Sequence, residues 1–190
     1  MTENEVRQLF VETGAILAGH FLLTSGLHSP LYAEKFQVLQ YPQHTARLCA
    51  ALAERFRQDD VQVVVGPVTG GILLAHEVGK NLGTRAIFTE RENGRMTLRR
   101  GFVINPGERV LVVEDIVTTG GSVVEVLDVV KEQGGVVVGV GMLVDRSGGK
   151  ADFGVPAQAL LHLDVPTYQP DDCPLCRDGV PITKRGSRKL

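Results

Sequence analysis

The chain has few cysteines, no tryptophan and no long apolar run. Three cysteines in 190 residues cannot form a disulfide framework, so a reduced cytoplasmic setting is expected. The apolar runs fall well short of the roughly 20 residues that span a bilayer, which argues against membrane insertion. A net charge of −2 gives no general attraction to nucleic acid. The N-terminus, MTENEVRQLF, lacks the basic and apolar regions of a secretory signal.

Apolar segments of two kinds alternate along the chain. Short β-branched runs at 61–66, 84–90, 109–115 and 136–145 predict buried strands, and amphipathic segments at about 43–58, 70–83 and 122–133 predict helices. An earlier helix is expected to open with a capping box at Thr2 and Glu5, to carry Ile16 and Leu17 on its apolar side, and to end at Gly19. This alternation predicts an α/β fold with a central, mainly parallel sheet flanked by helices.

The decapeptide VEDIVTTGGS at 113–122 carries the clearest chemistry. Glu114 and Asp115 end a predicted strand, and Thr118 to Ser122 form the turn that opens the next helix. Backbone amides of such a turn, together with the positive end of the helix dipole, form a cup for a phosphate, and glycines let the main chain approach it closely.

The two acids would repel a phosphate that they touched directly. They make sense if they bind another part of the same ligand, either the neighbouring sugar hydroxyls or a metal. The pattern therefore predicts a site for a phosphorylated ribose. For Glu114 or Asp115 alone, a helix cap beside a tight glycine turn is the simpler interpretation, but the complete decapeptide at a strand-to-helix junction favours the binding site.

Four segments together resemble the type I phosphoribosyltransferases, over nearly the whole chain. VLVVEDIVTTGGS resembles the family's signature for phosphoribosyl diphosphate (PRPP). GHFLLTSGLHSPLYAEK (19–35) is similar to the N-terminal hood of the orotate phosphoribosyltransferases, VVVGPVTGGILLA (63–75) to the pyrophosphate loop, and MLVDRSGG (142–149) to the segment whose arginine binds the orotate carboxylate.

The resemblance implies a single phosphoribosyltransferase domain over 1–190. Its hood would span about 1–40, its core about 41–165 and its C-terminal extension about 166–190, with the extension as a possible second part of the hood. The implied reaction is transfer of the 5-phosphoribosyl group of PRPP to orotate, with Mg²⁺ held mainly by PRPP and no metal ligands from the protein. A homodimer is also implied. A purine-type transferase and a non-catalytic PRPP-binding regulator are the alternatives.

The resemblance also assigns the binding residues. PRPP would contact Glu114, Asp115, Ile116, Val117, Thr118, Thr119, Gly120, Gly121 and Ser122, together with Gly66, Pro67, Gly70 and Gly71. Orotate would contact Arg146, the hood residues Thr24, Ser25 and Gly26, and Thr118, which would serve both substrates. The residues by themselves leave open a simple turn at Gly66 and Pro67 and an ordinary surface arginine at position 146.

The segment TERENGRMTLRRG at 89–101 contains four arginines and predicts a mobile loop or hairpin. An isolated basic hairpin would most simply be a solvated surface. The resemblance instead implies a loop that closes over the active site of the neighbouring subunit, where cationic side chains stabilise the departing pyrophosphate. Arg91 and Arg95 are assigned this catalytic role ahead of Arg99 and Arg100. The family more often has lysines and histidines in this loop.

The pair Cys173 and Cys176, in the sequence CPLC, supplies two of the four ligands that a structural zinc site requires. His162 and Cys49 are available as further ligands, but their spacing does not favour them. The sequence therefore favours packed, reduced thiols over zinc. The remaining histidines, at positions 20, 28, 44 and 76, are scattered along the chain.

Overall fold

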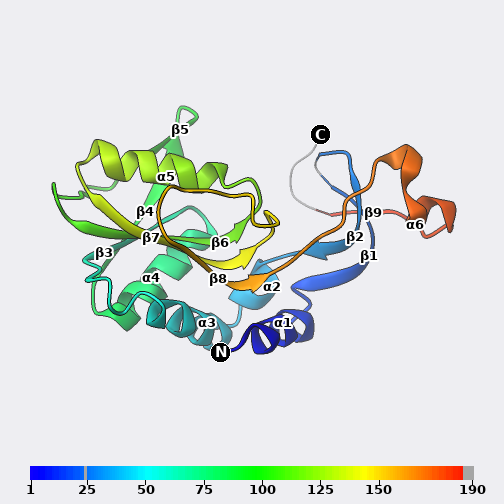
Figure 1. The fold of residues 1–190 in the computed structure, drawn as a ribbon, viewed down its shortest axis with the longest axis horizontal. Coiled ribbons are helices and arrows are strands. Elements are labelled where there is room, and N and C mark those ends of the chain that lie inside the picture. The colour runs from blue at the N-terminus through cyan, green and yellow to red at the C-terminus, as the bar shows by residue number, and fades with distance from the viewer. Residues whose placement is uncertain (24, 186–190) are drawn as a thin grey trace.

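The computed structural model describes residues 1–23 and 25–185 and contains two sheets (Figure 1). The larger sheet has six strands in the order β5-β4-β3-β6-β7-β8. All neighbouring strands are parallel except β4 and β5, so the expected mainly parallel sheet is confirmed. The strands are β3 (Val63–Pro67), β4 (Arg85–Glu92), β5 (Arg95–Leu98), β6 (Arg109–Val117), β7 (Val136–Asp145) and β8 (Ala157–His162).

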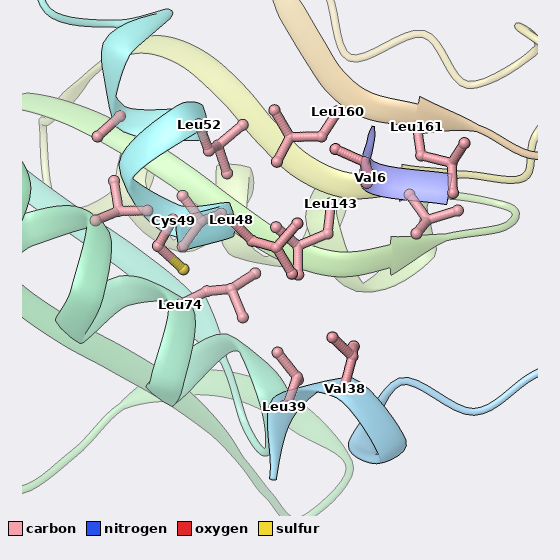
Figure 2. Close-up of a cluster of buried hydrophobic side chains, with 14 of the residues drawn as sticks. Val6, Val38, Leu39, Leu48, Cys49, Leu52, Leu74, Leu143, Leu160 and Leu161 are labelled. Carbon is pink, nitrogen blue, oxygen red and sulfur yellow. The ribbon is translucent and has the colours of Figure 1, made fainter. Parts of the chain in front are cut away.

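Helices cover both faces of this sheet because its strands are apolar on both sides. Val64 packs in one core with the helices α3 (Pro42–Glu54) and α4 (Gly70–Leu82), whereas Val63 and Val65 pack in another core with α5 (Gly121–Glu132). Figure 2 shows part of the first core, where Leu48 and Leu74 approach Leu143 of β7. Continuous burial on both faces explains why these strands read as apolar runs without polar alternation.

The smaller sheet joins the two ends of the chain and lies to one side of the larger sheet (Figure 1). It contains β1 (Ile16–Leu22), β2 (His28–Ala33) and β9 (Thr183–Lys184), in the order β2-β1-β9. A bridge between His28 and Tyr168 adds a second link between the terminal segments. The expected hood is thus confirmed, and the C-terminal segment contributes a strand to it. Short helices α2 (Phe36–Leu39), η1 (Pro170–Asp172) and α6 (Pro174–Arg177) complete the connections.

The N-terminal helix, α1 (Glu3–Glu12), is shorter than expected. Its capping box between Thr2 and Glu5 is present, with Thr2 N donating to Glu5 Oε2 at 2.6 Å. The chain turns at Gly14, where φ is +70°, and Ile16 and Leu17 then enter β1 instead of continuing the helix. The prediction that the helix reaches Gly19 was wrong, because pairing of β1 with β2 at Ile16 and Leu17 provides hydrogen bonds that local periodicity does not reveal.

Candidate active site

The connections of β3 and β6 create a crevice in the larger sheet. These two strands are neighbours, but α4 carries the chain from β3 to β4 on one side and α5 carries it from β6 to β7 on the other. Where adjacent parallel strands lead away in opposite directions, a crevice opens beyond their carboxyl ends, and ligands bind there. The segments 66–71 and 114–122 both begin at this edge, as the sequence predicted.

The segment after β6 forms a small cradle of about 70 Å³, lined by Glu114 and by residues 116–123. Gly120 is the N-cap of α5 and has φ +79°, a conformation that favours glycine. A β-carbon at this position would also lie 2.8 Å from the Phe153 ring. The first amides of α5 have no partner within the helix, and Thr118 and Thr119 are exposed beside them. The cradle therefore offers backbone and hydroxyl donors to an anion.

The acid pair lies beneath this cradle and is almost completely buried. Glu114 is 9% exposed and Asp115 is 1% exposed. Lys35 Nζ donates a hydrogen bond to Asp115 Oδ1 at 2.9 Å, whereas Asp115 Oδ2 is buried without a partner among the described residues. A buried oxygen without a partner is costly unless a ligand donates to it, so Asp115 is ready to accept a ligand hydroxyl. The sequence analysis did not single out Lys35, because its partner is 80 residues away.

Burial makes this pair unusual acids. It raises the pKa of Glu114 to about 8, with a further contribution from the charge of Asp115. Burial also raises the pKa of Asp115, although Lys35 opposes this effect. In the ligand-free chain Glu114 is therefore largely protonated near pH 7, and a ligand that donates hydroxyl groups would favour its charged form.

The raised pKa of Glu114 predicts that the ligand-free protein loses stability as pH rises. The folded chain binds the proton more tightly than the unfolded chain, so this contribution to stability is complete below the ordinary pKa of 4.5 and is lost as pH rises through about 8. The loss should be on the order of 1 kcal/mol or more between about pH 6 and pH 9. Denaturant titrations of the native chain and of Glu114→Gln over this range measure it. An equally steep decline in the variant would contradict the assignment to Glu114.

The segment after β3 touches the acid pair directly. A β-carbon on Gly70 would coincide with Asp115 Oδ2, and one on Gly66 would collide with the backbone of Gly71. Gly70 is therefore required for the close approach of this segment to Asp115, and Gly66 for the tight packing of the segment against its own Gly71. The Val68–Thr69 peptide between them is cis. The predicted pyrophosphate loop thus lies against the carboxylates at the same edge of the sheet.

Gly70→Ala should consequently be harmful even though alanine is the better helix former. The added methyl group would displace Asp115 and its bond to Lys35, and forced overpacking of this kind costs about 1–3 kcal/mol. At an ordinary helical position the same change would stabilise by about 1 kcal/mol. Chemical denaturation gives the sign of the change, and a variant more stable than the native chain would refute the contact.

A second cavity, of about 410 Å³, adjoins the cradle. Its lining is formed by Thr118, Thr119, Arg146, Ser147, Lys150, Ala151, Val165 and Thr167. Arg146 follows β7, and its backbone amide donates to the carbonyl of Val117 at 2.8 Å, which fixes it beside β6. In the part of the chain that the structure describes, the Arg146 Nε atom is buried without a hydrogen-bond partner. Burial lowers the pKa of Arg146, partly offset by the nearby Tyr32, so this guanidinium group would gain from an anionic ligand.

The described hood residues predicted to contact orotate, Ser25 and Gly26, are not part of this lining. Ser25 and Gly26 lie in the turn between β1 and β2, and Thr24 falls outside the described residues. Tyr32 of β2 is a hood side chain close enough to Arg146 to affect its pKa. Like Lys150 in the cavity wall, it was not selected in the sequence analysis. The sequence did offer a signal for Tyr32, because it is the aromatic residue that follows the Ser29-Pro30 pair of the hood segment.

The arginine-rich segment is the β4–β5 hairpin, with Asn93 and Gly94 at its turn. Arg91 forms an ion pair of 2.7 Å with Glu125, and Arg95 forms one of 2.6 Å with Glu132; both glutamates belong to α5. Arg99 and Arg100 pair with glutamates of β4. Neither Arg91 nor Arg95 is among the described residues that line the cradle or the Arg146 cavity. Within one chain, the hairpin does not complete the site.

A hollow of about 370 Å³ between this hairpin and α5 is a poor alternative site for an anion. Its lining includes the three carboxylates of Glu125, Asp128 and Glu132. The cradle at the end of β6, although smaller, provides the donors and the charge pattern that a phosphate requires.

In the described part of the chain no helix is long and apolar enough to cross a membrane.

Comparison with known proteins agrees with this architecture. Residues 37–153 match the phosphoribosyl transferase domain family. The orotate phosphoribosyltransferase of Desulforamulus reducens is 58% identical over 190 residues, covering 100% of both chains. The chain belongs to the orotate phosphoribosyltransferase family. The enzyme of that name from Thermotoga maritima is 50% identical over 185 residues, covering 97% of this chain and 99% of that one.

A solved structure of the family superposes on most of this chain. The orotate phosphoribosyltransferase of Mycobacterium tuberculosis, solved with inorganic phosphate, superposes with a TM-score of 0.70 at 26% identity, over 85% of this chain and 95% of that chain. The expected type I phosphoribosyltransferase fold is thereby confirmed. The family membership also extends over the hood, since the full-length relatives align with both terminal segments.

Proposed function

We propose that this chain transfers the 5-phosphoribosyl group of PRPP to orotate, giving orotidine 5′-monophosphate and pyrophosphate. The supporting observation is that two cavities share one wall. Thr118 and Thr119 line both the small anion cradle and the larger cavity that contains Arg146. A ribose phosphate and a planar carboxylated base could therefore lie side by side, with the sugar between them. The names of the full-length relatives favour the same substrate pair.

In this proposal each end of PRPP has its own partner. Its 5-phosphate binds the amides and hydroxyls of residues 118–122, and its ribose hydroxyls donate to Glu114 and Asp115. The neighbouring segment, with Gly66, Pro67, Gly70 and Gly71, lies against the pyrophosphate, and its backbone amides donate to it, except at Pro67, which has no N–H. Lys35 holds Asp115 in place, 2.9 Å away, and balances part of the buried negative charge.

Orotate would lie in the cavity of about 410 Å³ with its carboxylate on Arg146. The planar guanidinium group can bind a carboxylate through two parallel hydrogen bonds, which fixes the orientation of the ring. Thr118 then touches both the phosphate and the base. Ser25, Gly26 and the undescribed Thr24 remain proposed contacts from the hood, which would cover the base from the other side.

The reaction exchanges one bond at the sugar for another. A ring nitrogen of orotate forms a bond to C1 of the ribose as the bond from C1 to the pyrophosphate oxygen breaks, and the proton of that nitrogen is released to the pyrophosphate or to solvent. Positive charge grows on the sugar and negative charge on the pyrophosphate. The buried carboxylates would stabilise the charge on the sugar, and the cationic side chains would stabilise the charge on the pyrophosphate. Closure of the site keeps water away from the electron-poor sugar.

We propose Mg²⁺ as the cofactor. Among the described residues, the one group of three or more potential metal ligands consists of histidines and cysteines in the hood. Magnesium prefers oxygen ligands, which this group does not offer. The oxygens of PRPP would thus hold the ion, with Glu114 and Asp115 as the nearest acids of the chain. The bound ion would neutralise charge on the leaving pyrophosphate.

The position of the hairpin supports a homodimer. Arg91 and Arg95 form ion pairs with glutamates of α5 of their own chain, yet the cradle has no arginine among its described lining residues. The proposal is that they leave these exposed pairs and reach the pyrophosphate in the neighbouring subunit. Exposed ion pairs contribute roughly 0–1 kcal/mol, so their exchange for a more highly charged partner would be favourable.

The direct test is to incubate the purified chain with Mg²⁺, PRPP and one base at a time. Orotate should be consumed, with equal formation of pyrophosphate, and hypoxanthine, guanine and uracil should not react. Turnover of a purine instead of orotate would indicate the purine-type alternative. Binding of PRPP without turnover of any base would indicate the regulatory alternative. The variant Asp115→Asn should lose turnover while keeping the fold.

A further inference from the structure

Four potential metal ligands converge in the hood, away from the catalytic crevice. They are His20 from β1, His28 at the start of β2, and Cys173 and Cys176 at the two ends of the first turn of α6. One ligand atom from each lies within 4.8 Å of all the others. His20, His28 and Cys173 are buried. The candidates considered from sequence lie elsewhere: Cys49 is in the core on α3, and His162 is 64% exposed at its side chain beside Asp145.

The separations of these atoms match a tetrahedral site. Zinc binds nitrogen at about 2.0–2.1 Å and sulfur at about 2.3 Å, which at tetrahedral angles places ligand atoms roughly 3.3–3.8 Å apart. His20 Nε2 and His28 Nδ1 are 3.0 Å apart, and Cys176 Sγ is 3.3 Å from His28 Nδ1. Cys173 Sγ and Cys176 Sγ are 3.6 and 3.7 Å from His20 Nε2. These four separations are within a few tenths of an ångström of the tetrahedral values, and the remaining two are at most 4.8 Å.

The protonation of His20 supports metal binding. Its Nδ1 lies 2.7 Å from the carbonyl oxygen of Val180, which can only accept a hydrogen bond. Nδ1 therefore carries the ring proton, and Nε2 turns its lone pair toward the other three ligands. Zinc-binding histidines commonly have such a carbonyl partner on the second nitrogen, which fixes the tautomer and the ring orientation.

Without a cation the cluster has poor hydrogen bonding. Only one proton fits between His20 Nε2 and His28 Nδ1. Since His20 Nε2 has only a lone pair, His28 Nδ1 donates this proton, and the lone pair of His20 Nε2 accepts it. The thiols of Cys173 and Cys176 would then face nitrogens with no free lone pair. A divalent ion removes this conflict: it binds two thiolates and two neutral imidazoles, the site becomes neutral, and two thiol protons are released to solvent.

We propose that His20, His28, Cys173 and Cys176 form a structural zinc site. Thiolate and imidazole ligands select zinc over magnesium, and four protein ligands leave no open position for catalysis. The site connects β1 and β2 to a segment about 150 residues away in sequence. This segment otherwise joins the hood through the two-residue strand β9 and the bridge at Tyr168. Zinc therefore fastens the C-terminal segment to the hood.

The site also fixes the base of one turn. His20 and His28 flank residues 23–27, whose described ends are joined by a hydrogen bond from Leu23 N to Leu27 O of 2.8 Å. This turn carries Ser25 and Gly26. If the hood covers orotate, a point that rests on the proposed function, loss of zinc should raise the KM for orotate more than it lowers kcat.

The test is the zinc content of the purified full-length chain. About one zinc per chain is expected after exhaustive dialysis against metal-free buffer. Cys173→Ser, Cys176→Ser and His20→Gln should each lose most of it. Cys49→Ala and His76→Gln are the matched controls, since both residues lie outside the cluster, and they should keep full zinc content. Cobalt substitution should give thiolate-to-metal absorption in the native chain and weaken it in Cys176→Ser.

If the serine variants fail to fold, Cys176→His provides a second measurement. It keeps four ligands and should still bind one zinc per chain, with weaker thiolate absorption in its cobalt form. A reduced native chain that neither retains nor binds added Zn²⁺, or whose Cys173 and Cys176 form a disulfide in the presence of zinc, would overturn the proposal. Zinc content is independent of turnover, so an inactive chain with bound zinc would contradict the proposed function alone.

Discussion

Replacement of Arg91 or Arg95 by alanine is expected to lower kcat by about a hundredfold or more, while the Kd for PRPP changes little. The physical reason is that negative charge on the pyrophosphate is greatest as the bond to the sugar breaks, so a cation placed there stabilises the transition state more than the bound substrate. Single-turnover measurements separate the chemical step from binding. A variant with native kcat would remove that arginine from the catalytic role.

The matched control is Arg85→Ala. Arg85 is the first residue of β4, at the opposite end of the strand from the hairpin turn, and it also forms an ion pair, with Glu108 at 2.7 Å. It should alter kcat by less than about twofold, because surface pairs contribute little and this one is remote from the crevice. A comparable loss of kcat in Arg85→Ala would show that the hairpin variants act through general destabilisation.

A mixing experiment tests whether the arginines act across an interface. Arg95→Ala and Asp115→Asn should each be inactive, since one lacks the hairpin cation and the other lacks the ribose acceptor. If each site combines both subunits, mixed dimers contain one native site, and random reassortment should restore about a quarter of native activity. If the two residues act within one chain, the mixture should remain inactive.

Replacement of Arg146 by alanine is expected to reduce kcat/KM for orotate by about a hundredfold, because a charged, two-point hydrogen bond to a buried carboxylate contributes about 1.5–3 kcal/mol or more. Arg146→Lys should recover only part of this loss, since an ammonium group keeps the charge but not the planar fork. Removal of this partly buried cation, whose Nε atom has no partner among residues 1–23 and 25–185, should not destabilise the ligand-free chain.

Binding of PRPP in the absence of orotate provides the control for Arg146. The cradle and the acid pair lie on β6 and α5, and they keep their contacts in Arg146→Ala. The Kd for PRPP should therefore stay within about twofold of the native value. Loss of PRPP binding in this variant would indicate that Arg146 supports the cradle and does not bind the base.

Local patterns predicted much of the fold and the chemistry of the crevice. The apolar runs at 109–115 and 136–145 became β6 and β7, because residues buried on both faces of a parallel sheet must all be apolar. The decapeptide at 113–122 lies at a strand-to-helix junction, where the left-handed glycine and the free helix amides are properties of adjacent residues. The roles assigned to its individual residues remain predictions.

Periodicity failed at the hood for a physical reason. Ile16 and Leu17 continue the apolar side of a helix by spacing, but their backbone groups pair with Tyr32 and Ala33 of β2. No local pattern reveals that a partner strand is available. The same limit applies to Lys35 and Asp115, whose ion pair of 2.9 Å joins the end of the hood segment to β6.

The sequence by itself determined the parallel α/β core and the phosphate-cradle motif, because both depend on residues that are neighbours along the chain. Only the tertiary structure decided which distant residues meet. It joined the Cys173–Cys176 pair to His20 and His28, set Lys35 against Asp115, and paired Arg91 and Arg95 of the hairpin with glutamates of α5. These contacts arise from strand pairing and burial between segments far apart in sequence, which spacing along the chain does not encode.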